Sequence, residues 1–348
     1  MDFSLLKTLC ETPGVPGRED RIRAVVKDAL APLVDRIDVD VMGNVIAHKA
    51  GKGEQKIMVA AHMDEIGFLV KYIDSKGFLR LQPAGGFDPR QLFAQRLAVH
   101  GRGGEVLRGI LSYTTKPTHM LTAEEKNRPP VIENFFVDLG LPVEQVKEKV
   151  SIGDMATMDR TLEPCGEGFV GKSLDNRVGV FVMIQALRAL RHHDADIYAV
   201  ATTQEEIGLR GAITSAYAID PDVGVALDTT LANDYPGMAE HDAVTRWGEG
   251  VAIKIMDASM ISHPRVVEHV RGIAEREGLA HQLEILPRGG TDGGALQRAR
   301  GGTASITISV PTRYIHTVNE MVHRSDVEQA VTLLARYLEE VHNGQYAY

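Results

Sequence analysis

Short apolar runs that alternate with helical segments are the feature that most constrains the fold of this chain. The runs IMVAA (57–61), IYAVA (197–201), VGVAL (223–227) and ITISVP (306–311) are apolar along most of their length. Strands of a parallel sheet are covered on both faces, so they are apolar throughout and do not alternate. The runs therefore predict buried strands, and their alternation with helices predicts a layered α/β fold.

Helical segments lie between or beside these runs. Apolar residues recur with a period near 3.6 in four segments, at about 18–34, 177–193, 263–278 and 325–342. From about residue 68 to 159 the pattern changes to short alternating segments such as FLRLQPA and EVLRGILSY, broken by Gly-Gly and Pro. We therefore expect a small β domain at 68–159, inserted into a larger α/β domain made of 1–67 and 160–348.

Composition excludes several classes of protein. The chain has 348 residues, a net charge of -9 and no run of lysines and arginines, which argues against a nucleic-acid surface. No stretch approaches the roughly 18 consecutive apolar residues of a membrane span. The only cysteines, Cys10 and Cys165, have no metal-binding or redox spacing, and no signal peptide is recognisable. We expect a cytoplasmic protein.

Acidic and imidazole side chains follow the apolar runs. In open α/β sheets, ligands bind beyond the carboxyl ends of the strands. The candidate residues there are His62, Asp64, Glu205, Glu206, Asp228 and His316, and Asp175 lies at the expected start of a helix. Each residue alone is weak evidence, because an acid after a strand commonly begins a turn and an acid at a helix start is commonly a cap. Their convergence on several strand ends predicts a site.

The candidate set consists of nitrogen and oxygen ligands, which suit zinc, cobalt or manganese. It exceeds the three protein ligands that one catalytic zinc needs, so two metal ions about 3.5–4 Å apart, sharing one carboxylate, would use it better. Such a pair lowers the pKa of a bound water toward neutrality, and the resulting hydroxide attacks a carbonyl.

The adjacent glutamates Glu205 and Glu206 then need different roles. On an extended backbone, neighbouring side chains point to opposite sides, so one carboxylate can bind a metal while the other faces the water as general base. By the same geometry, Asp64 lies on the same side of the chain as His62 and is placed to orient its imidazole.

Six segments make the chain resemble a known family. AAHMDEIGFLV, SLDNRVGV, TTQEEIGLRGA, ALDTT, RGGTDGGAL and RYIHTVNEMVH are similar, in order, to the signature regions of the tetrahedral (TET-type) metallo-aminopeptidases. This family includes glutamyl, leucyl and deblocking aminopeptidases. The resemblance spans effectively the whole chain. It implies a three-layer α/β catalytic domain like that of zinc exopeptidases, with a PDZ-like β domain inserted.

The resemblance also implies a role for each candidate residue. His62 and Asp228 would hold one metal, Glu206 and His316 the other, Asp175 would bridge them, Glu205 would be the general base and Asp64 would support His62. Many relatives carry a second acid where this chain has Asn176, which would change the charge beside the bridge. The resemblance further implies a homododecamer that admits only peptides to its internal active sites.

The reaction expected is removal of N-terminal residues from short peptides, by a water or hydroxide between two divalent metals. A glycoside hydrolase remains an alternative, because some relatives are labelled endoglucanases and paired glutamates can cleave glycosides. A peptide-binding scaffold is a non-enzymatic alternative. The preferred N-terminal residue stays open, although Arg288 in the glycine-rich RGGTDGG segment could favour an acidic one.

Overall fold

A computed structural model describes residues 1–116 and 118–346 of the chain. These residues form two compact units, the first made of 1–65, 161–315 and 319–346, and the second of 66–116 and 118–160 with 316–318. The sequence predicts an insert at 68–159, and the second unit observed here begins and ends close to those positions. The added segment 316–318 contains one of the predicted metal ligands, His316. The assembly role expected of the insert stays a prediction.

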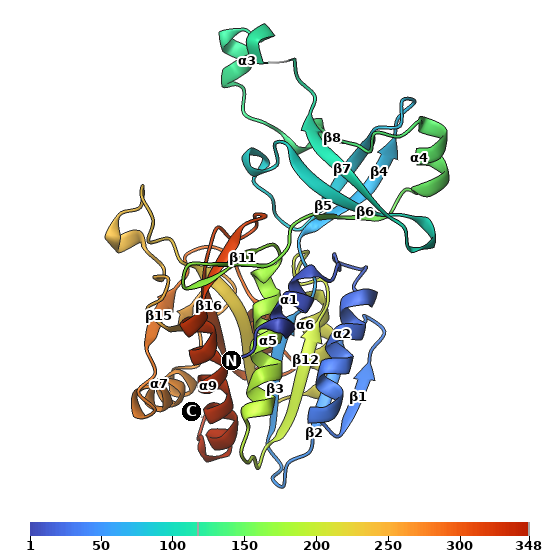
Figure 1. Cartoon of the computed structure of the whole chain (residues 1–348). Coiled ribbons are helices and arrows are strands. Elements are labelled where there is room, and N and C mark those ends of the chain that lie inside the picture. The colour runs from blue at the N-terminus through green and yellow to red at the C-terminus, as the bar shows by residue number, and fades with distance from the viewer. Residues whose placement is uncertain (117, 347–348) are drawn as a thin grey trace. The chain divides into compact units, whose positions relative to one another are not determined.

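The first unit is built on a mixed sheet of eleven strands within the described residues (Figure 1). Nine strands lie in the order β1 (Arg36–Val39), β2 (Val45–Lys49), β12 (Asp196–Thr202), β3 (Lys56–His62), β13 (Val223–Leu231), β16 (Ala304–Arg313), β17 (Glu320–His323), β11 (Gly168–Gly171) and β10 (Glu163–Cys165). The other two are β14 (Val251–Met256), which also pairs with β16, and β15 (His281–Ile285), which pairs with β14.

The centre of this sheet is parallel and its margins are antiparallel. β3 is parallel to β12 and β13, and β13 is parallel to β16, as the apolar runs predict. β1 and β2 form an antiparallel pair joined by a short turn, which a parallel pair could not use. β1 has no counterpart among the predicted strands, because its partly exposed sequence RIDV lacks an apolar run.

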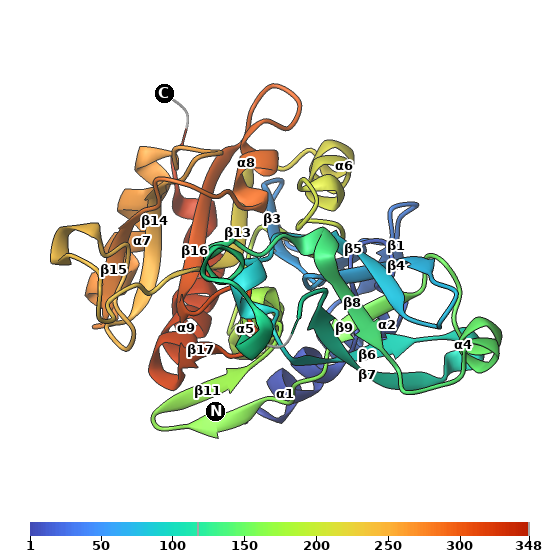
Figure 2. The ribbon, with the colours of Figure 1, turned by 90° about the horizontal axis from the view of Figure 1, so that it is seen from above.

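Helices cover both faces of the sheet, as the top view of this unit shows (Figure 2). One face packs against α1 (Ser4–Glu11), α2 (Asp20–Leu30), α5 (Leu174–Ala189), α7 (Pro264–Arg276) and α9 (Arg324–Glu340). The other packs against α6 (Arg210–Ile219) and α8 (Asp292–Gln297). Alternate side chains of β3 enter the two cores, with Val59 in the first and Met58 in the second. The result is a three-layer α/β unit.

In the first unit, α5 and α8 differ from the sequence prediction. α5 ends at Ala189 and does not continue to 193, and the backbone N–H of Arg191 donates to the Glu339 carboxylate beyond its end. α8 was not predicted, because the second and third residues of its sequence DGGALQ are glycines, which have low helix propensity. Thr291 caps it by accepting a hydrogen bond from the N–H of Gly293.

The second unit is a closed barrel of six strands, in the order β4 (Gly67–Ile73), β5 (Leu79–Ala84), β8 (Phe135–Asp138), β7 (Val106–Tyr113), β6 (Gln95–His100) and β9 (Met155–Met158). It also contains the short helices α3 (Ala123–Asn127) and α4 (Val143–Lys149). Phe68, Leu97, Leu111 and Val137 are among the buried residues of its core. The β character of this region is as predicted, whereas its likeness to a PDZ domain stays a prediction.

No helix within the described ranges combines the length and the hydrophobicity that a bilayer crossing requires.

Candidate metal centre

The site is assembled where the central parallel strands end. His62 is the last residue of β3, and Thr202, the last residue of β12, lies directly opposite it in the parallel ladder. The ladder between β13 and β3 pairs Ala226 with Ala60, so Asp228 lies two residues further on, level with His62. Parallel register therefore brings side chains that are far apart in the sequence to one edge of the sheet, as predicted for the carboxyl ends of the strands.

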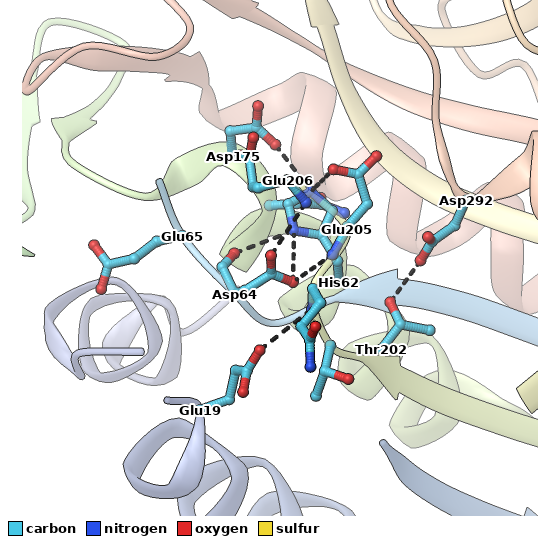
Figure 3. Close-up of polar contacts among 12 residues, drawn as sticks. Glu19, His62, Asp64, Glu65, Asp175, Thr202, Glu205, Glu206 and Asp292 are labelled. Carbon is cyan, nitrogen blue, oxygen red and sulfur yellow. Dashed lines mark hydrogen bonds and ion pairs between the residues drawn. The ribbon is translucent and has the colours of Figure 1, made fainter. Parts of the chain in front are cut away.

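Three carboxylates face one imidazole nitrogen. The Nε2 atom of His62 lies 3.3 Å from Asp175 Oδ1, 3.8 Å from Glu205 Oε2 and 3.8 Å from Asp228 Oδ1. Figure 3 shows Asp175 and Glu205, with Glu206 beside them, approaching His62 from different segments. His62 is 1 % exposed and Asp228 5 %, so the cluster is largely shielded from water.

The opposite side of the imidazole is held by the backbone. Nδ1 of His62 lies 3.1 Å from the carbonyl oxygen of Asp64, and because a carbonyl can only accept, Nδ1 donates. With Nδ1 donating, a neutral ring would present the lone pair of Nε2 to the three carboxylates. A lone pair that faces several buried acids is favourable only if a proton or a metal cation lies between them.

The pKa shifts of these residues also indicate that a cation is needed at the site. Burial, together with the charges of Asp228, Asp292 and Glu206, raises the pKa of Glu205 well above its usual value, although His62 opposes this. Burial and the charges of Asp175 and Asp292 likewise raise the pKa of Asp228, against the influence of His62 and Lys254. Burial alone would lower the pKa of His62, but the surrounding carboxylates raise it well above its usual value. The cluster is thus short of positive charge.

The residues present therefore fit a divalent metal centre. Two overlapping groups have ligand atoms that all lie within 4.8 Å of one another: His62 with Glu205 and Asp228, and His62 with Asp175 and Glu206. Imidazole nitrogen and carboxylate oxygen are ligands that zinc, cobalt and manganese accept. The second group contains Glu206, which the sequence assigns to a metal, whereas Glu205 in the first group is the residue expected to act as base.

Asp64 has contacts that the sequence did not reveal. Its Oδ1 atom accepts from the backbone N–H of Glu205 at 3.1 Å, and its Oδ2 atom from that of Glu206 at 3.2 Å. Oδ1 also lies 3.6 Å from Nδ1 of His62. The carboxylate predicted to orient His62 therefore also holds the backbone of the paired glutamates.

A second network fixes Asp175 and its neighbour. The N–H of Asp175 donates to Glu320 Oε2 at 2.9 Å. The side chain of Asn176 donates from Nδ2 to the carbonyl of Leu227 at 2.8 Å and accepts from the N–H of Gly179 at 3.1 Å. An aspartate at this position could not donate the first of these bonds. The asparagine therefore ties the start of α5 to the residue that precedes Asp228.

Comparison with known proteins agrees with this geometry. The family model described as M42 glutamyl aminopeptidase matches residues 43–333. The chain belongs to the M42 glutamyl aminopeptidase family. A putative aminopeptidase of Acetivibrio thermocellus is 41% identical over 95% of this chain and 97% of its own length. A lysyl aminopeptidase of Pyrococcus furiosus is 37% identical over 98% of both.

Solved M42-like structures have the same fold. An aminopeptidase of the archaeon Desulfurococcus kamchatkensis superposes with a TM-score of 0.92 at 40% identity, covering 97% of this chain and 94% of that one. The TET1 peptidase of Pyrococcus horikoshii, described as able to assemble into a tetrahedron or a large octahedral shell, gives 0.86 at 30% identity over 97% and 99%. A Thermotoga maritima protein named endoglucanase gives 0.80 at 30% identity, over 97% of each chain. The resemblance to TET-type aminopeptidases is confirmed.

Six of the seven predicted site residues of this M42 chain belong to the first unit. Around one of them, His62, lie the other five: Asp64, Asp175, Glu205, Glu206 and Asp228. The seventh predicted residue, His316, belongs to the second unit, where its Nδ1 atom lies 3.4 Å from the place that a Cβ on Gly86 would occupy. His316 has a left-handed φ of 62°. Its role as a metal ligand, like the other assigned roles, stays a prediction.

Two further acids of the site were missed. Asp292, at the start of α8, accepts a hydrogen bond from Thr202 Oγ1 at 2.5 Å and is 1 % exposed. Burial is the main reason that its pKa rises to about 6. Glu19, which precedes α2, accepts a hydrogen bond from the backbone of Gln204. The only sequence signal for Asp292 was its place in RGGTDGG, and Glu19 had none.

Proposed function

We propose that this protein is an aminopeptidase that uses two divalent metal ions to remove N-terminal residues from short peptides. Zinc is the first candidate, with cobalt and manganese as alternatives. Membership of the M42 family and the aminopeptidase names of the relatives support the reaction. The observation that carries the proposal is the convergence of Asp175, Glu205 and Asp228 on Nε2 of a buried histidine whose Nδ1 atom is already bonded.

The proposed ligand set divides between the two ions. His62 and Asp228 would hold one, Glu206 and His316 the other, and Asp175 would bridge them. Asp175 supports this central role because its Oδ1 atom is the nearest of the three carboxylate oxygens to His62 Nε2. His316 enters the set on the strength of the sequence.

The reaction needs a base, and Glu205 is the proposed one. When bound, the two cations would acidify a water molecule and polarise the peptide carbonyl. Glu205 would take the proton of the attacking water and deliver it to the nitrogen of the departing amine. Asp64 would keep the carboxylate in place through the N–H groups of Glu205 and Glu206.

Glycoside hydrolysis is the alternative, because one similar solved structure is named an endoglucanase. A glycosidase of the usual kind needs two carboxyl groups that flank one bond. Here the acids converge on a histidine, and Asp175 and Asp228 would have no part in that reaction. The geometry favours the aminopeptidase.

Chelation separates these functions. The purified protein is assayed on aminoacyl reporter peptides and on a soluble glucan, before and after treatment with EDTA and again after zinc or cobalt is restored. We expect peptide cleavage to disappear on chelation and to return with metal, while elemental analysis counts two equivalents per chain. Glucan cleavage that survives chelation would establish the alternative, and peptide cleavage by the fully demetallated protein would refute the proposal.

The assembled state is part of the same proposal. We expect a tetrahedral homododecamer in which the insert, PDZ-like in character, makes contacts between subunits, as the assemblies described for the Pyrococcus horikoshii TET1 peptidase suggest. Light scattering should then give a mass near twelve times the 38.0 kDa of one chain. A monomeric mass would exclude this arrangement. Both cysteines are free, which suits the cytoplasmic location we expect.

A further inference from the structure

Four consecutive backbone N–H groups hold the turn that carries Glu205 and Glu206. Each donates to a buried side-chain oxygen from a distant part of the chain. The four bonds are Thr203 N to Asn44 Oδ1 at 2.9 Å, Gln204 N to Glu19 Oε1 at 3.2 Å, Glu205 N to Asp64 Oδ1 at 3.1 Å and Glu206 N to Asp64 Oδ2 at 3.2 Å. We call the three acceptor residues Glu19, Asn44 and Asp64 the amide clamp.

The clamp is built from buried groups on three separate segments. Glu19 is 2 % exposed, and Asn44 and Asp64 are fully buried. Glu19 immediately precedes α2, Asn44 precedes β2, and Asp64 follows β3. The carbonyl oxygen of Glu205 is also satisfied, because it accepts from the N–H groups of Gly208 and Leu209, each at 2.9 Å. The turn is therefore held through both its donors and its acceptors.

Within the amide clamp, Glu19 contacts the residue of the turn that has the rarest backbone conformation, Gln204. Gln204 has a φ of 56°, in the left-handed region that non-glycine residues rarely adopt. Such a conformation is energetically unfavourable for a residue with a side chain and persists only where surrounding contacts enforce it. Oε1 of Glu19 accepts from the N–H of Gln204 at 3.2 Å and from that of Gly17 at 2.8 Å. One carboxylate oxygen thus joins the start of α2 to the turn.

The direction of Glu205 depends on that peptide. β12 ends at Thr202, and Gln204, two residues further on, has the left-handed φ. A rotation there would swing the following residues, which include both glutamates, relative to His62. Asp64 accepts from the N–H groups of the two glutamates themselves. Glu19 accepts from the N–H of Gln204, the residue whose conformation directs both glutamates toward His62.

We propose that Glu19 is a positioning residue for Glu205 and acts by accepting the hydrogen bond of the Gln204 amide. This proposal rests on the proposed function of Glu205 as general base. Glu19 acts through the backbone and touches neither substrate nor metal. Its effect on the reaction should therefore fall on turnover more than on the binding of substrate.

Three variants test this role. Glu19→Ala removes the acceptor, whereas Glu19→Gln keeps an oxygen that can occupy the position of Oε1 and serve both N–H groups. Asp326→Ala is the matched control, because Asp326 is equally buried and accepts from two backbone amides, those of Gly248 and Gly250, at 2.8 and 2.9 Å. It removes a comparable pair of bonds from a different part of the same unit.

The measurements are hydrogen exchange of the 203–206 amides, kcat and KM on a reporter peptide, bound metal, and Tm. We expect Glu19→Ala to accelerate exchange at 204–206 by about tenfold, because these amides lose the contact that holds the turn. The same variant should lower kcat by about tenfold, since a misplaced Glu205 slows the reaction, and should leave KM within about twofold. A tenfold change corresponds to about 1.4 kcal/mol. Glu19→Gln should restore both to within about threefold, in keeping with the loss of a charge but not of the acceptor. Asp326→Ala should lower Tm and leave exchange at 203–206 and kcat unchanged.

Several results would overturn the proposal. Exchange and kcat in Glu19→Ala that match the unsubstituted protein would show that the turn needs no clamp at this residue. Equal impairment in Glu19→Ala and Glu19→Gln would show that the acceptor oxygen is not what matters. If the unsubstituted protein cleaves no peptide, the proposed function fails, while the exchange rates still decide whether Glu19 holds the turn.

Discussion

Two neighbouring acids, Asp64 and Glu65, belong to buried clusters of opposite electrostatic character. The Glu65 carboxylate is matched by cations: Lys172 Nζ lies 2.5 Å from Oε2 and Arg177 Nη2 lies 3.6 Å from Oε1. Although burial raises the pKa of Glu65, Lys172 and Arg177 outweigh burial and hold the pKa below its usual value. Around His62, by contrast, the pKa values of Glu205 and Asp228 are raised.

The contrast separates a structural cluster from a functional one. Ser173 and the N–H of Gly14 complete the bonds of Glu65, while Arg177 also donates to the carbonyl oxygens of Leu9 and Thr12. This cluster ties the segment after α1 to the start of α5. The His62 cluster has more acids than cations, so it can be balanced by protons or by metal ions. The deficit of charge, more than burial itself, marks the site.

The largest effect should come from removing the proposed base. Glu205→Gln keeps the shape of the side chain but cannot take up a proton, so kcat should fall by about 10²–10⁴-fold. Bound metal and Tm should stay near those of the unsubstituted protein. Elemental analysis and thermal unfolding provide these controls. A fully active Glu205→Gln enzyme would remove Glu205 from the base role, and it is also what a peptide-binding scaffold without catalysis predicts.

The charge-matched cluster should respond through stability. Lys172→Met leaves the Glu65 carboxylate buried beside one fewer cation, so the free energy of unfolding should fall by about 3–5 kcal/mol. Arg271→Met is the matched control, because its ion pair with Glu275 is exposed and contributes under about 1 kcal/mol. Urea denaturation measures both. Equal losses in the two variants would contradict the distinction between the clusters.

The charge-deficient cluster should respond with the opposite sign. Asp228→Asn removes one of several buried acids, so the demetallated protein should become more stable at pH 7 by about 1 kcal/mol or more. The same variant should lose one of the two metal equivalents proposed for the site. Unfolding after chelation and elemental analysis test the two halves. A demetallated variant less stable than its parent would show that Asp228 is needed for packing.

The stability of the demetallated protein should also depend on pH, because the acids of the charge-deficient cluster have raised pKa values. The pKa of Asp292 is about 6 in the folded chain and 3.8 as the reference value, and the pKa values of Glu205 and Asp228 are raised too. The folded state therefore binds more protons than the unfolded state, and stability should fall as pH rises from about 4 to 6. Urea denaturation at pH 4.5, 5.5 and 6.5 tests this. Asp292→Asn should flatten the dependence, and a stability that rises with pH would contradict the sign.

The smallest effect should come from the edge of the site. Thr202→Val deletes the hydroxyl that donates to Asp292 while keeping the volume of the side chain. The loss of one buried hydrogen bond should cost about 1 kcal/mol of stability. Because Thr202 is paired with His62 only through the backbone, kcat should stay within about threefold. A loss of kcat comparable to that of Glu205→Gln would place Thr202 and Asp292 in the reaction itself.

The α/β fold and most of the candidate site could be read from the chain because both follow from local patterns. The apolar runs that became β3, β12, β13 and β16 are long enough to identify, and their carboxyl ends lie at one edge of a parallel sheet. Several elements were not predicted, among them β1, β14, α3, α4 and α8. β1 is partly exposed and α8 has glycines at its second and third positions, so tertiary contacts outweigh local preference there.

By itself, the sequence indicated which residues could serve a metal centre and predicted different roles for Glu205 and Glu206. Only the tertiary structure decided how the turn that carries them is held: Glu19, Asn44 and Asp64 each accept a backbone amide of that turn from a separate segment. The sequence pattern cannot predict these hydrogen bonds, because they join residues that are far apart in the chain and at no regular spacing. The charge deficit around His62 was likewise decided by folding, since it depends on which cations the packed chain leaves near each acid.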